Sequence, residues 1–313
     1  MVEEFKFNIS IPHKFIFVQG PTATGKSDWA LHWAQKYHGH IINCDSIQLY
    51  QGLKIGSAQP TEDELSLVPH HLYDYVQAPQ EITAGIYCRD FWQRIDSFKT
   101  PQLFFVVGGT GFYFQALEKG MLPVAAVNVA TMSKLEAEYD EDQDGPQKLY
   151  LELQVHDPVS AEKIHPADRY RLCRALEIIR SHGKTLSELK SNYLSQAKKF
   201  PFPLLKLSRQ WGTDELRARI TARVDQMIQK GLEEEVRRFA KFENWAPLAS
   251  VGYKETVEYL QHRDKQRWRD EMVLHTVQLV KKQKTWFKRD KELVHLDHID
   301  QALSLLDNFV QND

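Results

Sequence analysis

A short stretch near the start of the chain has the composition of a phosphate-binding loop. It fits the pattern G-x-x-x-x-G-K-[ST] and consists of Gly20, Pro21, Thr22, Ala23, Thr24, Gly25, Lys26 and Ser27. In such a loop, successive backbone N–H groups surround an anion, and glycines let the backbone approach it. Lys26 offers a positive charge to phosphate oxygens, and Ser27 offers a hydroxyl to Mg²⁺, directly or through water. We therefore expect residues 20–27, named the phosphate loop below, to hold a phosphate or diphosphate group.

A carboxylate follows the next apolar run of the chain. Residues 41–44 read as a buried strand, and Asp45 and Ser46 come directly after it. The carboxyl ends of parallel strands meet at one edge of a sheet, so Asp45 is expected beside the phosphate loop. A carboxylate there suits a general base, a Mg²⁺ ligand through water or a helix N-cap. Residues 108–111, named the glycine loop, follow another apolar run and bring Thr110 to the same edge.

Apolar runs alternate with helical patterns along the chain. Strands are expected at 15–18, 41–44, 103–107, 204–207 and 293–296. Helices are expected at 27–37, 112–117, 213–241, 254–259 and 269–288. The alternation predicts an α/β fold with a P-loop NTPase-like, doubly wound parallel sheet.

Residues 121–200 interrupt this alternation with a mainly helical pattern. Its expected breaks are Gly145-Pro146, Asp157-Pro158, His165-Pro166 and Gly183. We interpret 121–200 as a helical insertion, and 1–120 plus 201–313 as the core with C-terminal helices. A chain of 313 residues has room for about two domains of ~150 residues each.

The charges are unevenly distributed. The net charge of −2 excludes a uniformly basic nucleic-acid binder, but it does not exclude local basic faces. Residues 160–200 carry nine Lys or Arg against four Asp or Glu, and residues 281–291 carry six against one. Residues 136–152 carry seven acids and one lysine. These runs predict distinct charged faces or, alternatively, ordinary solvated helix faces.

The composition also bears on the compartment. Three cysteines are scattered without a metal or disulfide pattern, which is typical of a reducing compartment. No apolar run approaches the ~20 residues of a membrane span. The first ten residues include Glu3 and Glu4 and lack the apolar core of a signal peptide. We expect a cytoplasmic protein with no membrane partner.

The motifs and their order resemble the tRNA dimethylallyltransferase (tRNA isopentenyltransferase) family. The resemblance covers most of the chain from Phe15 to Phe287. Besides the phosphate loop, the matching blocks are DSIQLYQG (45–52), IGSA (55–58), PHHL (69–72), VGGTGFY (107–113), RLCRALE (171–177), GKT (183–185), VGYKE (251–255) and residues 276–287. The sequence contains no zinc-finger pattern of the eukaryotic kind, which favours the bacterial type.

The resemblance implies a reaction, a cofactor and partners. A dimethylallyl group would pass from dimethylallyl diphosphate to N6 of the adenine at position 37, next to the anticodon, of certain tRNAs. The implied cofactor is Mg²⁺, and the implied partners are dimethylallyl diphosphate and the tRNA anticodon arm. The phosphate loop would hold the diphosphate of the donor, the helical insertion would bind tRNA, and we expect the protein to be a monomer.

The resemblance also implies roles for residues. Asp45 is similar to the family's general base, Arg223 resembles the arginine that binds the leaving diphosphate, and Thr22 joins them as a catalytic residue. The implied tRNA-binding residues are Asp45, Ser46, Ile47, Gln48, Thr110, Tyr170, Arg171, Leu172, Cys173, Arg174, Ser250, Val251, Gly252, Tyr253 and Lys254. Because Arg171 and Arg174 are three apart on an expected helix, both are expected to face phosphates.

One departure from the family pattern and one other function accompany this interpretation. Met132 stands where the family usually has an arginine, which leaves the expected tRNA contact there without its usual residue. The alternative function is a P-loop small-molecule kinase, in which Asp45 deprotonates an acceptor hydroxyl and residues 169–174 close over ATP. Against a GTPase, the sequence has no N-K-x-D motif.

Overall fold

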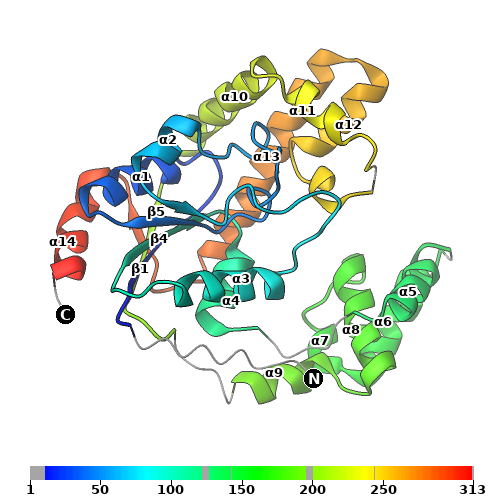
Figure 1. Ribbon diagram of the computed structural model, residues 1–313. Helices are drawn as coiled ribbons and strands as arrows, with labels where there is room; N and C mark the ends of the chain where they lie inside the picture. The colour runs from blue at the N-terminus through cyan, green and yellow to red at the C-terminus, as the bar shows by residue number, and fades with distance from the viewer. Residues whose placement is uncertain (1–10, 122–126, 142, 195–199, 243, 312–313) are drawn as a thin grey trace. The chain divides into compact units, whose positions relative to one another are not determined.

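The computed structural model describes residues 11–121, 127–141, 143–194, 200–242 and 244–311. They form two compact units (Figure 1). The sheet unit lies within Phe7–Glu118 and Phe200–Asp313, and the helical unit lies within Lys119–Lys199. The boundaries expected from the sequence, at 120/121 and 200/201, fall within two residues of these.

Within the described residues, the sheet unit contains a six-stranded parallel sheet. The strands are β1 (Lys14–Gln19), β2 (His40–Asn43), β3 (His70–His71), β4 (Leu103–Gly108), β5 (Leu204–Arg209) and β6 (Val294–Leu296). Their order across the sheet is β3-β2-β4-β1-β5-β6. All five expected strands are confirmed. The two-residue β3 was not predicted, because two residues show no periodicity.

The sheet unit also contains the helices that connect and cover the strands. They are α1 (Lys26–Lys36), α2 (Glu62–Leu67), α3 (Ala84–Asp96), α4 (Gly111–Lys119), α10 (Thr213–Gln229), α11 (Leu232–Phe239), α12 (Tyr253–His262), α13 (Lys265–Phe287) and α14 (Leu303–Gln311), with short 3₁₀ turns at Ala246–Ala249 and Ile299–Ala302. The single helix expected at 213–241 is wrong. It breaks at Gly231, whose positive φ of 93° is a backbone conformation that glycine adopts readily.

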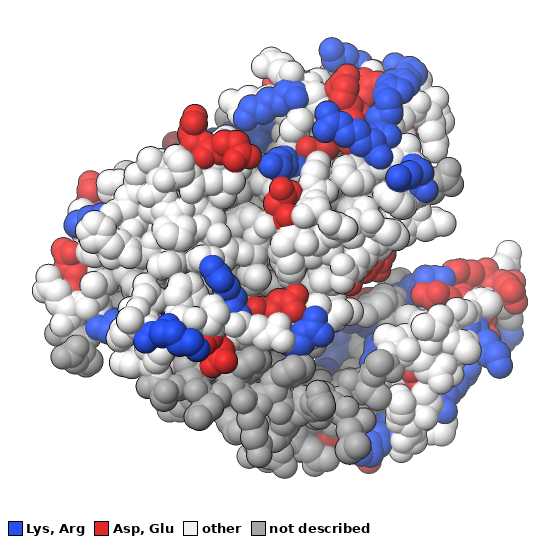
Figure 2. Space-filling view, in the orientation of Figure 1, with Lys and Arg blue, Asp and Glu red and all other residues white. Residues whose placement is uncertain are grey.

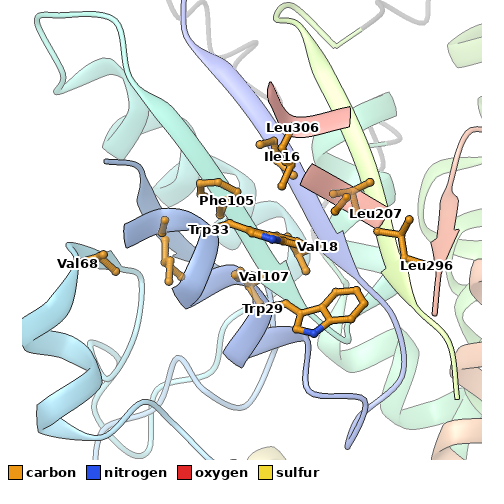
Figure 3. Packing of buried hydrophobic residues seen from close by; sticks show 14 residues of the cluster. Ile16, Val18, Trp29, Trp33, Val68, Phe105, Val107, Leu207, Leu296 and Leu306 are labelled. Atoms are coloured by element: carbon orange, nitrogen blue, oxygen red, sulfur yellow. The ribbon is translucent and has the colours of Figure 1, made fainter. Parts of the chain in front are cut away.

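Helices pack on both faces of the sheet, which confirms the doubly wound prediction. On one face, Trp33 of α1 packs against Phe105 of β4 in a cluster that includes Leu306 of α14 (Figure 3). On the other face, the rings of Phe15 and Phe17 lie against α3 and α4 respectively. Because both faces are covered, β1 and β4 are almost wholly apolar.

The helical unit is a small bundle with its own core. Its helices are α5 (Val129–Glu141), α6 (Gly145–His156), α7 (Pro158–Ala161), α8 (Arg169–His182) and α9 (Leu186–Leu194). Leu135, Leu153 and Leu176 are fully buried at its centre. The breaks expected at Asp157-Pro158 and Gly183 are confirmed, since Asp157 caps α7 and Gly183 ends α8 with a φ of 63°. No described helix is both long and apolar enough to cross a membrane.

Candidate active site

The phosphate loop connects β1 to α1, where the sequence placed it. Gly25 precedes α1 in the left-handed conformation, with a φ of 76°, and Ala23 also has a positive φ of 62°. The hydroxyl of Thr24 is buried and donates to the Pro21 carbonyl at 2.9 Å, so Thr24 shapes the loop from inside. The loop thus presents the amino end of α1, where backbone N–H groups favour an anion.

The phosphate loop is held by residues from far along the chain. The Trp211 indole N–H donates to the Thr24 carbonyl at 2.8 Å, and Arg219 Nε donates to the Ala23 carbonyl at 2.9 Å. The Arg209 guanidinium lies between the rings of Trp29 and Trp211, at 4.5 and 4.3 Å from their centroids. These contacts fix the backbone of the phosphate loop at Ala23 and Thr24.

Two cations and one carboxylate interact electrostatically at the loop. Lys26 Nζ donates to the Pro21 carbonyl at 3.1 Å. Burial lowers the pKa of Lys26 to about 8, Asp45 opposes this shift, and the positive charge of Arg223 adds to it. Burial also lowers the pKa of Arg223, against the opposing charge of Asp45. Arg223 forms no hydrogen bond or ion pair with any residue that the structure describes, so its guanidinium is available to a ligand.

Asp45 is held at the end of β2 by its neighbours. Its backbone N–H donates to Asn43 Oδ1 at 2.8 Å, and its own Oδ1 accepts the Ile47 N–H at 3.0 Å. Within the described part of the chain, Oδ2 has no hydrogen-bond partner. One carboxylate oxygen therefore fixes the turn, and the other remains free to accept a proton.

The glycine loop lies directly against Asp45. A side chain at Gly108 would place its Cβ 1.9 Å from the Cys44 carbonyl oxygen, and one at Gly109 would come within 3.6 Å of Asp45 Oδ2. The Thr110 hydroxyl accepts the Ser46 N–H at 3.0 Å and donates to the Ser46 hydroxyl at 3.2 Å. Thr110 thus positions the residues that follow Asp45, in addition to the tRNA contact expected of it.

A cavity of about 720 Å³ opens beside the phosphate loop. Its polar lining residues include Lys26, Ser27 and Arg223, and Leu31, Ile41 and Met227 contribute apolar surface. Gln48 also lines it and donates to the carbonyls of Ser57 and Ala58. The cavity can therefore accommodate a ligand with an anionic end and a short apolar portion.

The sequence matches a known family. Residues 48–290 match the family model described as IPP transferase. The chain belongs to the IPP transferase family. It is 49% identical over 285 residues to a tRNA dimethylallyltransferase of Bdellovibrio bacteriovorus, covering 90% of this chain and 92% of that relative. A tRNA dimethylallyltransferase of Geobacter sulfurreducens is 34% identical over 294 residues, covering 91% and 92%.

Solved structures of IPP transferase relatives have the same fold. The full-length tRNA isopentenylpyrophosphate transferase of Bacillus halodurans is 28% identical, with a TM-score of 0.66 and 95% of each chain covered. A eukaryotic dimethylallyltransferase, solved as snapshots of its action on tRNA, is 25% identical with a TM-score of 0.75, covering 95% of this chain and 78% of that one. These similarities confirm the predicted P-loop NTPase-like fold.

Two residues expected to contact tRNA instead form the core of the helical unit of this IPP transferase. Leu172 and Cys173 on α8 are fully buried, in a cluster with Leu135. A helix turns each successive side chain by about 100°, so five consecutive residues do not face one partner. The expected contacts of Leu172 and Cys173 are therefore corrected. Met132, the departure from the family pattern, also packs against this core.

Arg174 has a structural partner as well. Its guanidinium pairs with Glu177, whose side chain is 0% exposed and whose other oxygen accepts the Asn128 N–H at 2.9 Å. Arg174 neutralises a buried carboxylate, and its side chain is 18% exposed, so the phosphate contact expected of it stays a prediction. Tyr170 and the Arg171 side chain are 65% and 64% exposed, so they remain available to a partner.

Tyr253 supports the cavity wall and does not face solvent. It is 1% exposed, and its hydroxyl donates to Glu235 at 2.8 Å and accepts the Ser57 N–H at 3.0 Å. The Glu235 carboxylate also accepts the N–H groups of Lys54, Ile55 and Gly56. The expected tRNA contacts of Tyr253 and of the buried Gly252 are therefore corrected, whereas Ser250, Val251 and Lys254 retain exposed surface.

Lys26 gives the site a testable pH dependence. An anion favours the charged amine, but above pH 8 the amine is mostly neutral in the ligand-free protein. Above pH 8, pyrophosphate binding should therefore take up a proton at Lys26. The Kd of the wild-type protein for pyrophosphate should then rise with pH by up to about tenfold per pH unit more than the Kd of Lys26→Met does. Calorimetry at pH 8.5 in two buffers of different ionisation enthalpy measures the uptake. Equal proton uptake by wild type and Lys26→Met would contradict the assignment.

Proposed function

We propose that this protein transfers a dimethylallyl group from dimethylallyl diphosphate to N6 of the adenine at position 37 of tRNA. Membership of the IPP transferase family and relatives named tRNA dimethylallyltransferase support dimethylallyl transfer to tRNA. The observation that carries the proposal is the position of Asp45, which has one free carboxylate oxygen and interacts electrostatically with Lys26 and Arg223. The kinase alternative is not favoured, because relatives that match 90% or more of the chain carry the transferase name.

The donor binds with its diphosphate at the phosphate loop. The amino end of α1, Lys26 and the Thr22 hydroxyl provide positive charge and hydrogen-bond donors for the phosphate oxygens. The five-carbon chain then extends along the apolar surface that Leu31, Ile41 and Met227 contribute to the cavity. A cavity lined by both cationic and apolar residues suits a prenyl diphosphate.

Mg²⁺ fits the same location. This ion prefers hard oxygen ligands and usually combines one or two protein ligands with substrate phosphates and water. The exposed hydroxyl of Ser27, in the first turn of α1 and on the cavity wall, is such a ligand. When bound, Mg²⁺ would neutralise charge on the diphosphate of the donor.

Asp45 acts on the acceptor. The exocyclic amine of adenine is a weak nucleophile, because its lone pair is delocalised into the ring. As N6 forms a bond to the allylic carbon, the carbon–oxygen bond to diphosphate breaks and its electron pair leaves with the diphosphate. The free Oδ2 of Asp45 takes the proton that N6 loses, while Arg223 and Lys26 stabilise the negative charge on the leaving group.

The acceptor adenine must leave its stack to reach Asp45, which costs a few kcal/mol. We assign contacts with the tRNA to Asp45, Ser46, Ile47, Gln48, Thr110, Tyr170, Arg171, Ser250, Val251 and Lys254. The helical unit contributes less free positive charge than its composition suggests. Arg169 pairs with Glu136 and Asp140, and Arg180 pairs with Glu138 and Glu152. Figure 2 accordingly shows basic and acidic side chains side by side on this unit.

Alanine substitutions at Arg171 and at Arg174 should therefore have different effects on RNA binding and on stability. Arg171→Ala should flatten the salt dependence of binding to an anticodon stem-loop by about one unit of slope and leave stability unchanged. Arg174→Ala leaves the buried Glu177 unpaired, so it should lower the free energy of unfolding by roughly 3 kcal/mol. Titrations at several salt concentrations and urea unfolding measure the two effects. An unchanged salt slope in Arg171→Ala would remove Arg171 from the RNA surface.

The acceptor atom is tested by product analysis. Purified protein, dimethylallyl diphosphate and Mg²⁺ are incubated with an anticodon stem-loop, and the nucleosides are separated after digestion. We expect N6-dimethylallyladenosine, and no product from a stem-loop with guanosine at position 37. Modification of the guanosine stem-loop, or of another atom of the adenine, would contradict the proposal.

A further inference from the structure

A glutamine of α13 joins the two loops on either side of Asp45. Gln283 Oε1 accepts the Thr22 N–H of the phosphate loop at 2.9 Å. Its Nε2 donates to the Gly109 carbonyl of the glycine loop at 2.9 Å. One amide group therefore fixes the distance between backbone atoms from two loops that follow different strands.

Gly109 shows how closely this contact lies to the proposed base. A Cβ at Gly109 would stand 2.7 Å from Gln283 Nε2, 3.5 Å from the Gly20 carbonyl and 3.6 Å from Asp45 Oδ2. The amide of Gln283, the start of the phosphate loop and the free oxygen of Asp45 thus converge on one point. A shift of either loop would change the separation of the phosphate loop and Asp45.

We propose that Gln283 is a positioning residue that sets the alignment between the bound donor and Asp45. The inference rests on the proposed function, because it assigns the donor diphosphate to the phosphate loop. An amide is required, since one end must accept from Thr22 and the other must donate to Gly109. Displacement of reacting groups by about 1 Å costs on the order of 10²-fold in rate.

The position predicts a specific kinetic pattern. Gln283→Met keeps the length of the side chain and removes both hydrogen bonds. Gln283→Glu keeps the acceptor for Thr22 and removes the donor to Gly109. Both variants should lose about 10- to 100-fold in single-turnover rate at saturating donor and stem-loop. Because Lys26 and the amino end of α1 remain and methionine adds no charge, the Kd of Gln283→Met for pyrophosphate should stay within about threefold of wild type.

Gln266→Met is the matched control. Gln266 lies on the same helix, is exposed, and bonds Asp270 one turn away. This variant should react, bind and melt like wild type. No transfer by wild type or by Gln266→Met would contradict the proposed function itself, whereas the Gln283 variants test only the positioning role.

Two results would overturn the inference. One is a single-turnover rate for Gln283→Met within twofold of the Gln266→Met rate. The other is a raised Kd for pyrophosphate with an unchanged rate at saturation, because Gln283 would then only stabilise the phosphate loop. Should Gln283→Met fail to fold, Gln283→Asn decides instead. This variant shortens the side chain by one methylene, so a wild-type rate overturns the proposal and a reduced rate in folded protein supports it.

Discussion

Asp45→Asn should lower the single-turnover rate of dimethylallyl transfer by about 10²- to 10⁴-fold, the usual contribution of a general base. Asparagine keeps an Oδ1 that accepts the Ile47 N–H, so the turn after β2 is preserved. It replaces the free oxygen with an amide that takes up no proton. Rapid-quench measurements with donor and stem-loop both saturating give this rate directly.

Asp28→Asn separates the loss of a base from the loss of charge. Like Asp45, Asp28 acts electrostatically on Arg223, but it lines the cavity from α1 and does not follow β2. We expect Asp28→Asn to retain most of its rate, and both variants to bind pyrophosphate and stem-loop as wild type does. A rate for Asp45→Asn within a few-fold of wild type would show that the base lies elsewhere.

Arg223→Ala should lower kcat by about 10²- to 10³-fold and change the KM for dimethylallyl diphosphate much less. Negative charge grows on the leaving oxygen in the transition state, and one fixed donor to such charge contributes about 2.7–4 kcal/mol. Arg223 is half-buried, interacts electrostatically with Asp45 and has no hydrogen-bond or ion-pair partner among the described residues. Steady-state kinetics with varied donor concentration measure kcat and KM separately.

Arg217→Ala is the control for this effect. Arg217 lies on α10, as Arg223 does, but it is exposed and lines a different hollow of the surface. Its removal changes the net charge of the helix equally and should leave both constants unchanged. A large increase in KM with an unchanged kcat for Arg223→Ala would assign Arg223 to ground-state binding of the donor.

The parts of this site that follow from local patterns could be predicted. The phosphate loop is one strand-to-helix connection, and its glycines, Lys26 and Ser27 are adjacent in sequence. Asp45 was predictable because a parallel sheet brings the ends of its strands to one edge. The strand at 204–207 was predictable from its own apolar run, although in the sequence the helical unit lies between this run and β1 to β4.

Other residues of the site carry no local signal. Gln283 contacts Thr22 across 261 positions, and Trp211 contacts Thr24 across 187. Nothing in the spacing of either residue indicates a loop so far away. Trp211 stands out as an aromatic residue in a polar stretch, but its partners are known only from the fold.

The corrected contacts show where a matching motif misleads. The family resemblance assigns residues 170–174 to tRNA as one block, although a helix exposes only part of any such block. Leu172, Cys173 and Leu176 lie on one face of α8, and this spacing is typical of a buried face. Helical periodicity would have separated these residues from Tyr170 and Arg171.

The identity of the transferred group is the central claim, and a double-label experiment tests it directly. The protein is incubated with an anticodon stem-loop, Mg²⁺, dimethylallyl diphosphate carrying ¹⁴C in its chain and ATP carrying ³²P in its γ-phosphate. We predict that ¹⁴C enters the RNA in proportion to pyrophosphate released, that ³²P enters nothing, and that Asp45→Asn abolishes most of the ¹⁴C transfer. Transfer of ³²P to any acceptor without incorporation of ¹⁴C would contradict the account and indicate a kinase.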